Sequence, residues 1–184
     1  MQEEVIFAGF GGQGVLFAGQ LLAYAAMREG KHVTWVPSYG PEMRGGTANC
    51  IVVVSDEPIG SPIVRHPSVA VVFNNPSMLK YSGLVRRGGL LVVNRSLVLA
   101  TAERDDITVL SIPATDLANE LGEIRLTNMI LSGAMLTLRP MVAVDSLIEV
   151  LRAELPKRKQ HLLQSNIEAI RMGQRFAQEQ QVPT

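Results

Sequence analysis

Cysteine and charged residues are scarce in this chain of 184 residues, which has one cysteine and 18% charged side chains. The lone thiol of Cys50 cannot form an internal disulfide, and an iron–sulfur cluster usually takes four thiolates. The three histidines, His32, His66 and His161, lie far apart without the spacing of metal ligands. The chain alone is therefore expected to hold neither a cluster nor a zinc ion.

Net charge and long apolar runs are also missing. The 17 basic side chains are balanced by 17 acidic ones, whereas a nucleic-acid-binding protein is normally basic. The most apolar stretch, residues 129–138, is about half the ~20 residues needed to cross a bilayer. The acidic start, residues 1–4, lacks the basic region of a signal peptide. These features predict a cytoplasmic protein that binds neither nucleic acid nor a membrane.

The order of strand and helix patterns predicts one α/β domain over residues 1–184, with 47% apolar residues available for its core. Strand patterns occur at 5–8, 32–36, 48–55, 69–73, 90–93 and 107–112. Helical patterns run from Val15 to a cap at Gly30, over 77–85 and 114–121, from a cap at Asn128 to Arg139, from a Ser146–Glu149 capping box, and over 157–180. This alternation predicts a three-layer, Rossmann-like, mostly parallel sheet with a helical C-terminal third.

A glycine-rich turn follows the first predicted strand and opens the first predicted helix. Residues 9–14, Gly-Phe-Gly-Gly-Gln-Gly, match the pattern G-x-G-x-x-G. Glycines let a phosphate approach the backbone closely, and the free amides of the following helix donate hydrogen bonds to it. The candidate phosphate-binding residues are Gly9, Gly11, Gly12, Gln13 and Gly14.

Two other interpretations of this turn stay open. A nicotinamide dinucleotide needs an acidic residue about 20 residues beyond the turn, and residues 36–38, Val-Pro-Ser, offer none. NAD is therefore the weakest candidate ligand. The glycines can equally serve tight packing of the strand on the helix, or the close approach of a partner's backbone.

A second segment rich in glycine and proline, residues 37–46, is predicted to be a long loop at the carboxyl ends of the strands, where ligands and partners bind. Glu42 and Arg44 within it either contact a substrate or another subunit, or form a local ion pair that shapes the loop. We favour the interface because so many residues of special geometry lie there.

Other candidate residues have ordinary structural explanations. Cys50 lies in an apolar strand and is expected to belong to the core. Asn74 and Asn75 are expected to cap a helix. Lys157-Arg158-Lys159 begins the last predicted helix, where cations are slightly unfavourable, so it is either a site for an electrostatic partner or a solvated face.

Motifs spread over most of the chain resemble the gamma subunit, or gamma domain, of 2-oxoacid:ferredoxin (2-oxoacid:acceptor) oxidoreductases. They are Gly-Phe-Gly-Gly-Gln-Gly-Val at 9–15, Ser-Tyr-Gly-Pro-Glu-Met-Arg-Gly-Gly-Thr-Ala at 38–48, Phe-Asn-Asn-Pro at 73–76, and Asn128 with Gly133-Ala134. The second motif is the most specific. The chain looks more like the 2-oxoglutarate type than the pyruvate type.

The resemblance implies a complex that decarboxylates a 2-oxoacid, with 2-oxoglutarate the expected one, transfers the acyl group to coenzyme A and passes electrons to ferredoxin. Thiamine diphosphate, Mg and iron–sulfur clusters are then expected on alpha and beta partner subunits, with a delta or ferredoxin-like chain as a further partner. The isolated chain is expected to be inactive and to carry no catalytic residue. Separately from the resemblance, the apolar helix at residues 129–138 and the low charge of the chain predict that the isolated chain can form a homodimer.

The same resemblance places residues in this chain. Gly11, Gly12, Gln13 and Gly14 are expected to face the phosphates of coenzyme A. The partner or substrate loop is expected to comprise Tyr39, Glu42, Arg44, Gly45 and Gly46. Two alternative functions are kept: a purely structural interaction subunit of such a complex, and a free-standing nucleotide-dependent reductase.

Overall fold

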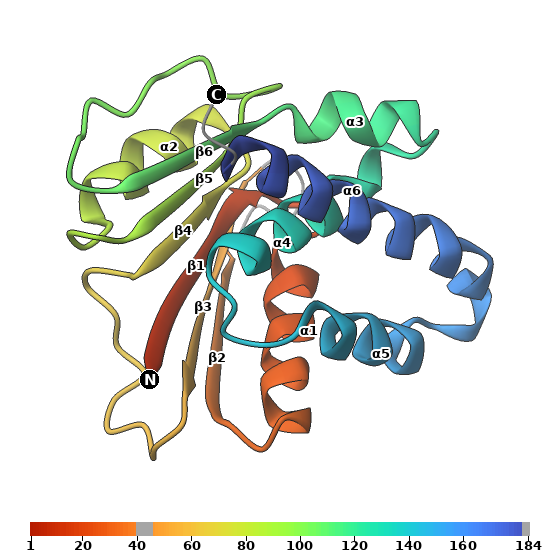
Figure 1. Cartoon of the computed structure of the whole chain (residues 1–184), viewed down its shortest axis with the longest axis horizontal. Coiled ribbons are helices and arrows are strands. Elements are labelled where there is room, and N and C mark those ends of the chain that lie inside the picture. Colours follow the sequence, from red (N-terminus) through yellow and green to blue (C-terminus); the bar gives the residue numbers. More distant parts are fainter. Residues whose placement is uncertain (40–45, 182–184) are drawn as a thin grey trace.

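The computed structural model describes residues 1–39 and 46–181 and contains a six-stranded sheet in the order β2-β3-β1-β4-β5-β6 (Figure 1). The strands are β1 Gln2–Phe10, β2 His32–Tyr39, β3 Thr47–Ser55, β4 Val69–Val72, β5 Leu90–Asn94 and β6 Thr108–Ile112. Strands β1, β4, β5 and β6 are parallel neighbours, whereas β3 is antiparallel to both β1 and β2. The predicted mostly parallel sheet is confirmed.

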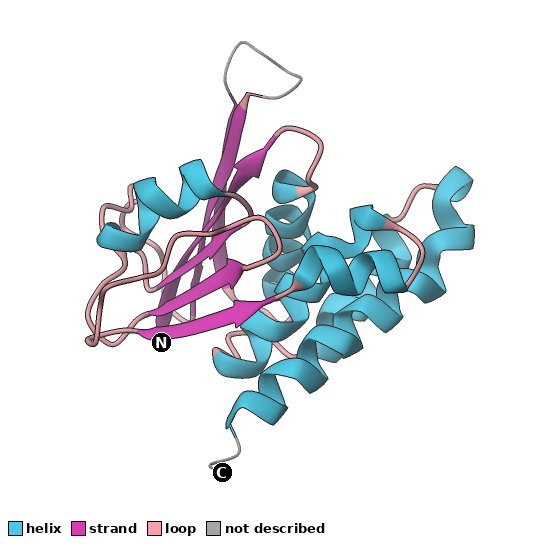
Figure 2. Cartoon of the chain, turned by 90° about the horizontal axis from the view of Figure 1, so that it is seen from above, coloured by secondary structure: helices cyan, strands magenta, loops and turns pink. Residues whose placement is uncertain are grey.

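Helices cover both faces of the sheet unequally (Figure 2). On one side lie α1 Val15–Arg28, α3 Ala114–Glu120, α4 Thr127–Leu138, α5 Val144–Glu154 and α6 Leu163–Gln181, and on the other lies α2 Asn75–Tyr81. Short 3-10 helices are η1 Ser82–Leu84, η2 Ile124–Leu126 and η3 Lys157–Leu162. The helical C-terminal third is therefore confirmed. No described helix combines the length and the hydropathy that a membrane span requires.

Alternation along the strands explains the two apolar layers. In β1, Val5 and Phe7 belong to the larger cluster beneath α1 and α4, whereas Ile6 and Ala8 belong to the smaller cluster beneath α2. Both faces of this strand are buried, so it reads as a continuous apolar run. The result is a three-layer arrangement of helices, sheet and helix. Strand β1 lies between the two helical layers, and the glycine turn follows it at the carboxyl ends of the parallel strands.

Several predicted boundaries move because of tertiary contacts. The predicted loop 37–46 begins with three strand residues, since β2 extends to Tyr39 and pairs Pro37 with Cys50. Proline is tolerated there because β2 is an edge strand. Helix α2 begins at Asn75, two residues before the predicted start, and continues as η1 to Leu84 instead of reaching residue 85 as one helix.

The caps predicted for two later helices are wrong. Asn128 lies inside α4, whose N-cap is Leu126. Helix α5 begins at Val144 with Ala143 as its N-cap, so Ser146 and Glu149 form no capping box. The carboxylate of Glu29, at the end of α1, accepts a hydrogen bond from the Ala143 amide at 2.7 Å. A side chain from a distant segment thus caps the amino end of α5.

The last helix is also divided. Residues 157–162 form η3, and α6 proper begins at Leu163. Where α4 crosses α6, a Cβ atom on Gly133 of α4 would lie 2.9 Å from the carbonyl carbon of Ile170, and one on Gly173 of α6 would lie 2.8 Å from that of Ile130. The two helices thus touch backbone to backbone, and α4 is buried over Thr127–Leu136 by α6 and the sheet.

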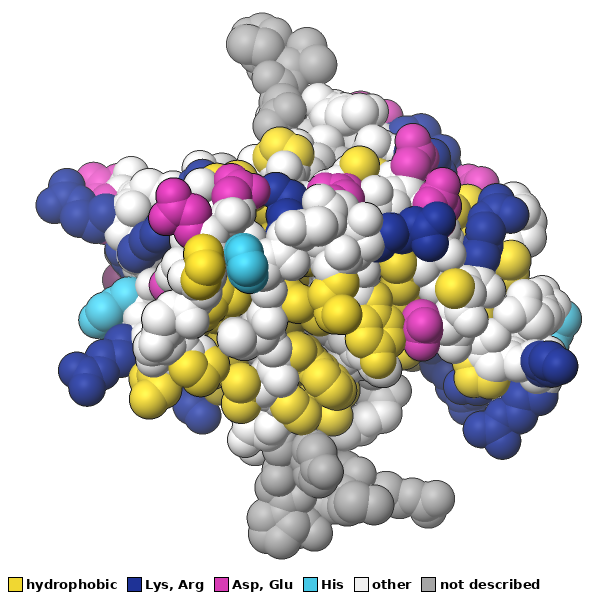
Figure 3. Space-filling model, turned by 90° about the horizontal axis from the view of Figure 1, so that it is seen from below, with side chains coloured by type: hydrophobic (Ala, Val, Ile, Leu, Met, Phe, Trp, Pro, Cys, Tyr) yellow, Lys and Arg dark blue, Asp and Glu magenta, His cyan; other side chains and the backbone are white. Residues whose placement is uncertain are grey.

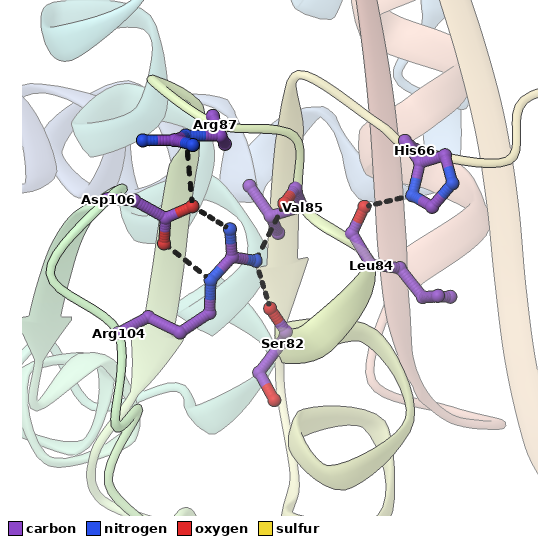
Figure 4. Close-up of polar contacts among 7 residues, drawn as sticks. All are labelled: His66, Ser82, Leu84, Val85, Arg87, Arg104 and Asp106. Carbon is purple, nitrogen blue, oxygen red and sulfur yellow. Dashed lines mark hydrogen bonds and ion pairs between the residues drawn. The ribbon is translucent and has the colours of Figure 1, made fainter.

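A charged cluster at the amino ends of β5 and β6 fixes the segment between them (Figure 4). Arg104 donates two hydrogen bonds to Asp106, at 2.8 and 2.7 Å, and two more to the carbonyls of Val85 and Ser82, at 2.7 and 3.2 Å. The hydrogen bonds from Arg104 hold the pKa of Asp106 below its usual value. This cluster lies at the opposite end of the sheet from the glycine turn and has a structural role.

Candidate functional site

The glycine turn connects the end of β1 to the start of α1. Gly14 is the N-cap of α1 and has a φ of 74°, and Gly12 has a φ of 94°. Both values lie in the left-handed region that favours glycine. Gln13 folds back so that its Oε1 accepts a hydrogen bond from the Phe10 amide at 2.7 Å, which closes the turn.

Three neighbouring segments hold the turn in place. The amide of Gly11 donates to the carbonyl of Gly46 at 3.0 Å, at the start of the strand that returns along β1. Asn74, the N-cap of α2, donates to Gln13 Oε1 at 3.4 Å. Asn128 of α4 donates its side-chain amide to the carbonyl of Gly14 at 3.1 Å. The turn is therefore built from distant parts of the chain.

The individual glycines serve different purposes. A Cβ atom on Gly9 would lie 2.9 Å from both Phe73 Cβ and Val15 Cγ2, and one on Gly14 would lie 2.9 Å from Asn128 Cγ. Close packing thus explains these two glycines. A Cβ atom on Gly12 would meet no atom of residues 1–39 and 46–181 within 4 Å. Among the described residues nothing covers Gly12, so its backbone is open to a ligand or a partner.

Three cavities meet at Gly12. The apolar cavity, of about 450 Å³, is lined mainly by the turn, Ala48 and the first turn of α1. The basic cavity, of about 410 Å³, lies between the turn and a wall that includes Arg125 and Lys159. The small cavity, of about 160 Å³, extends toward Thr115. The three together surround the start of α1 with accessible space.

The start of α1 can donate hydrogen bonds into this space. The amide of Ala18 is the first to find a partner within the helix, the carbonyl of Gly14 at 3.0 Å. The preceding amides of the first turn have no intrahelical acceptor, and Gly14 supplies no side-chain cap. Such amides, with the partial positive charge of the helix end, suit a phosphate or another anion.

A buried polar network supports the carboxyl edge behind the turn. Asn94, which is fully buried at the end of β5, donates to Thr115 Oγ1 at 2.9 Å and to the carbonyl of Phe73 at 3.3 Å. The hydroxyl of Thr127 adds to this network by donating a 3.4 Å hydrogen bond to Thr115 Oγ1. Sequence reasoning missed these residues, although a polar residue directly after an apolar strand is a usable signal at this edge of a parallel sheet.

The structure places the predicted site residues as follows. Gly9, Gly11, Gly12, Gln13 and Gly14 form one turn, and Gly46 is hydrogen-bonded to it. The backbone of Tyr39 pairs with Ala48. Glu42, Arg44 and Gly45 lie outside the described residues.

Cys50 is a core residue, as predicted. It is fully buried, and its Sγ lies 3.6 Å from the carbonyl of Val15 beneath α1. Burial raises the pKa of this thiol to about 12, because the thiolate would be desolvated. The thiol therefore stays protonated and unreactive near neutral pH.

Comparisons with known proteins agree with this architecture. A family model for pyruvate ferredoxin/flavodoxin oxidoreductase matches residues 4–176. The 2-oxoglutarate synthase subunit KorC of Methanocaldococcus jannaschii is 34% identical over 184 residues, covering 97% of this chain and 96% of KorC. The ketoisovalerate oxidoreductase subunit VorA of Methanothermobacter marburgensis is 45% identical over 138 residues, covering 73% of this chain. The chain matches only 28% of the length of VorA.

Solved structures show the same fold. The gamma subunit of a keto/oxoacid ferredoxin oxidoreductase from Geobacter sulfurreducens matches with a TM-score of 0.81 and 27% identity, covering 96% of this chain and 99% of that one. A 2-oxoglutarate:ferredoxin oxidoreductase from Magnetococcus marinus matches with a TM-score of 0.89 and 25% identity, covering 97% of this chain and 31% of that one. The chain therefore belongs to the pyruvate ferredoxin/flavodoxin oxidoreductase family, and it resembles the gamma chains of that family.

Proposed function

We propose that this chain is the gamma subunit of a multi-subunit 2-oxoacid:ferredoxin oxidoreductase, in which it completes the complex and helps to bind coenzyme A. The observation that carries the proposal is the match with KorC over nearly the whole of both chains. A gamma chain of this kind works with partners that supply thiamine diphosphate, Mg and iron–sulfur clusters. The single buried cysteine supports this division, because a cluster usually takes four thiolates.

Coenzyme A is the proposed ligand of the glycine turn. The solved enzyme from Magnetococcus marinus is described with 2-oxoglutarate, coenzyme A and succinyl-CoA bound. Coenzyme A carries a diphosphate, which suits the open backbone at Gly12 and the free amides that begin α1. The apolar cavity beside the turn offers surface for the uncharged arm of the ligand.

In this proposal the chain binds and orients, and the alpha and beta subunits perform the decarboxylation. Electrons then pass to ferredoxin, and the isolated chain is inactive. We take 2-oxoglutarate as the first candidate substrate, because KorC chains from several archaea match along most of their length. Other relatives are named as subunits of a ketoisovalerate oxidoreductase, VorA, and of a pyruvate synthase, PorC, so these two 2-oxoacids are the alternative substrates.

The second candidate function is a purely structural subunit whose glycine turn packs against a neighbour. The glycines at positions 9 and 14 are explained by packing within the chain, so they require no ligand at the turn. On the underside of the molecule, hydrophobic side chains gather in a central area with charged side chains around it (Figure 3). A contiguous apolar surface of this kind suits contact with a partner subunit. Both candidate functions require an assembly, and they differ in whether the turn binds a ligand.

Binding of coenzyme A to the assembled complex separates the two candidates. The complex would be purified through an affinity tag on this chain and titrated with coenzyme A by calorimetry. Gly12→Asp places a negative charge in the open space beside the turn, so the affinity for coenzyme A should fall by about tenfold or more. Gly12→Ala separates the effect of the positive φ from the effect of the charge and should lose much less.

Gly30→Asp is the matched control for this experiment. Gly30 also has a positive φ, 74°, and open space around its Cβ position, but it lies at the other end of α1. It should leave the affinity unchanged. Normal coenzyme A binding by an intact Gly12→Asp complex would remove the ligand role and leave the structural one. Purification of the chain without larger partners, or turnover of a 2-oxoacid by the chain alone, would overturn the proposal itself.

A further inference from the structure

The sheet has two edge strands, and they differ in how well they are protected from pairing with a further strand. Strand β2 carries Pro37, which lacks the amide that a further strand would need at that position. Strand β6, Thr-Val-Leu-Ser-Ile at 108–112, contains neither a proline nor a charged residue. In residues 1–39 and 46–181 no strand lies beyond β6, which leads into α3 (Figure 1). The outer edge of β6 is therefore open to a further strand.

The backbone of Val109 and Ser111 faces this open edge. The amide of Thr108 donates to the carbonyl of Gly89 at 2.9 Å, so Thr108 directs its backbone toward the neighbouring strand β5. Successive residues of a strand direct their backbone groups to opposite edges. Val109 and Ser111 therefore point outward, and both residues are exposed. A row of outward amides and carbonyls is a template for another strand.

A hollow of about 320 Å³ lies beside this edge, on the face of the sheet that carries α2. It is lined by Val109, Ser111 and the segment 98–102, among others. Leu99 of that segment is 87% exposed, and Val109 is 38% exposed. Apolar side chains beside an unpaired strand form a surface of the kind that another polypeptide covers. The apolar helix at residues 129–138 offers no such surface, because α4 is buried over Thr127–Leu136.

Opposite charges lie at the two ends of the same edge. Arg95 follows β5 and lines the hollow at the carboxyl end of the strands. Glu103 lies in the segment that enters β6 at its amino end. Both side chains are exposed, and neither takes part in an ion pair within residues 1–39 and 46–181, whereas Arg104 next to Glu103 is paired with Asp106. An antiparallel neighbour with the same charges would therefore complement both ends at once.

We infer that the outer edge of β6 is the contact surface for a second copy of this chain. The two β6 strands pair antiparallel about a two-fold axis at Leu110, so that Val109 lies opposite Ser111 of the second copy and exchanges backbone hydrogen bonds with it. The sheet then continues from one copy into the other. The same axis brings the two hollows side by side and places Arg95 of each copy near Glu103 of the other. This inference does not depend on the coenzyme A role.

Sedimentation equilibrium of the 184-residue chain tests the contact. A pairing of five-residue strands is small, so the mass should rise from 20.0 kDa to twice that value over about 1–100 μM. Val109→Lys places two like charges beside the axis and should raise the dissociation constant of the dimer by about tenfold or more. Circular dichroism checks that the variant stays folded.

Val36→Lys is the matched control. Val36 is 41% exposed, close to the value for Val109, but it lies in the other edge strand, β2. Its dimer should dissociate as the wild type does. A wild-type chain that stays monomeric at the highest concentration, or a dimer that Val109→Lys leaves intact, would overturn the inference.

Exchange of the two charges tests the antiparallel arrangement itself. Arg95→Glu and Glu103→Arg should each weaken the dimer by about threefold or more, because like charges then meet across the axis. The double variant should recover the wild-type affinity, since it restores opposite charges at both ends. Two single losses that simply add in the double variant would refute this arrangement.

The purified complex supplies a second measurement. Native mass spectrometry should count two copies of this chain in each complex, and Val109→Lys should halve that number. If the wild-type chain were monomeric alone and Val109→Lys released a different subunit from the complex, the edge would belong to that subunit and the second copy would be excluded. The proposed function would stand in that case, because it requires only that the chain joins an assembly.

Discussion

Asn128 donates its side-chain amide to the carbonyl of Gly14, 3.1 Å away, across 114 residues of sequence. Gly14 has a φ of 74° and begins α1, and a Cβ atom at this position would lie 2.9 Å from Asn128 Cγ. The first turn of α1 is therefore built directly against α4. Any residue with a Cβ atom at position 14 would therefore disturb both the left-handed backbone and the contact with Asn128.

Gly14→Ala should lower the free energy of unfolding by about 3 kcal/mol. The left-handed conformation costs a residue with a Cβ atom about 1–2 kcal/mol, and the clash with Asn128 adds an overpacking cost of about 1–3 kcal/mol. Urea unfolding measures the difference. Gly30 has the same φ of 74°, and no atom of the described residues lies within 4 Å of its Cβ position. Gly30→Ala therefore measures the backbone cost alone, about 1 kcal/mol.

A double-mutant cycle with Asn128→Ala separates the two costs further. Shortening Asn128 removes the obstacle, so Gly14→Ala should cost about as much in that background as Gly30→Ala does in the wild type. Equal losses for Gly14→Ala in both backgrounds would mean that Asn128 does not constrain this position.

Local patterns predict the beginning of this fold well. The apolar run at residues 5–8 marks β1, and the spacing after Val15 with the cap position at Gly30 marks α1, which ends at Arg28. These features depend on residues a few positions apart, so the sequence alone is enough. The capping role of Asn74 is also local, because its Oδ1 accepts a hydrogen bond from the Ser77 amide at 3.0 Å.

Features that depend on distant contacts escape sequence reasoning. Asn128 looks like a cap because it precedes an apolar helix, yet its partner is Gly14, and Glu29 substitutes for the expected cap of α5. The glycine pattern locates the turn but not the wall of the basic cavity. No motif surrounds Arg125 in the sequence, and Lys159 belongs to a run of basic residues that is typical of a solvated surface. Only the fold shows that both residues line the same cavity as Gly12.

Gly133→Ala should destabilise the crossing of α4 and α6 by about 2 kcal/mol or more. Alanine favours a helix over glycine by about 1 kcal/mol. Here a Cβ atom would press on the backbone of Ile170, 2.9 Å from its carbonyl carbon, and overpacking against backbone costs about 3 kcal/mol. Gly173→Ala should behave alike, because it meets the backbone of Ile130. Thermal or urea unfolding measures both.

The control for this crossing is Gly83→Ala in η1. That glycine is exposed, and no atom in the described part of the chain lies within 4 Å of its Cβ position, so the free energy of unfolding should change by no more than about 0.5 kcal/mol. A Gly133→Ala variant as stable as the wild type would show that α4 and α6 can separate slightly at no cost.

Cys50 should resist alkylation in the folded protein. With a pKa of about 12, about one thiol in ten thousand is ionised at pH 8, and the thiolate is the reactive form. Iodoacetamide at pH 8 should label the native chain extremely slowly and the urea-unfolded chain at the normal rate. Gly60→Cys, which adds a thiol at an exposed position, should be labelled quickly at that site alone. Fast labelling of the native wild type would contradict the burial of Cys50.

The ion pair between Lys31 and Asp56 should make stability depend on acid pH. Lys31 Nζ lies 2.8 Å from Asp56 Oδ1, and this hydrogen bond, together with the amino group of Met1, lowers the pKa of Asp56 from 3.8 to about 2. Because the folded pKa is depressed, the stabilisation is complete above the unfolded value. It is lost as the pH falls from about 4 to about 2.

Asp56→Asn should therefore lower the Tm at pH 7, and the gap from the wild type should close as the pH approaches 2. Asp56 is about half exposed, so 0.5 M NaCl should also narrow the gap at pH 7. Asp105→Asn removes an exposed carboxylate that forms no ion pair among the described residues, and its Tm should follow the wild type at every pH. A difference between Asp56→Asn and the wild type that persisted unchanged at pH 2 would mean that the Asp56 side chain stabilises the protein through packing and not through its charge.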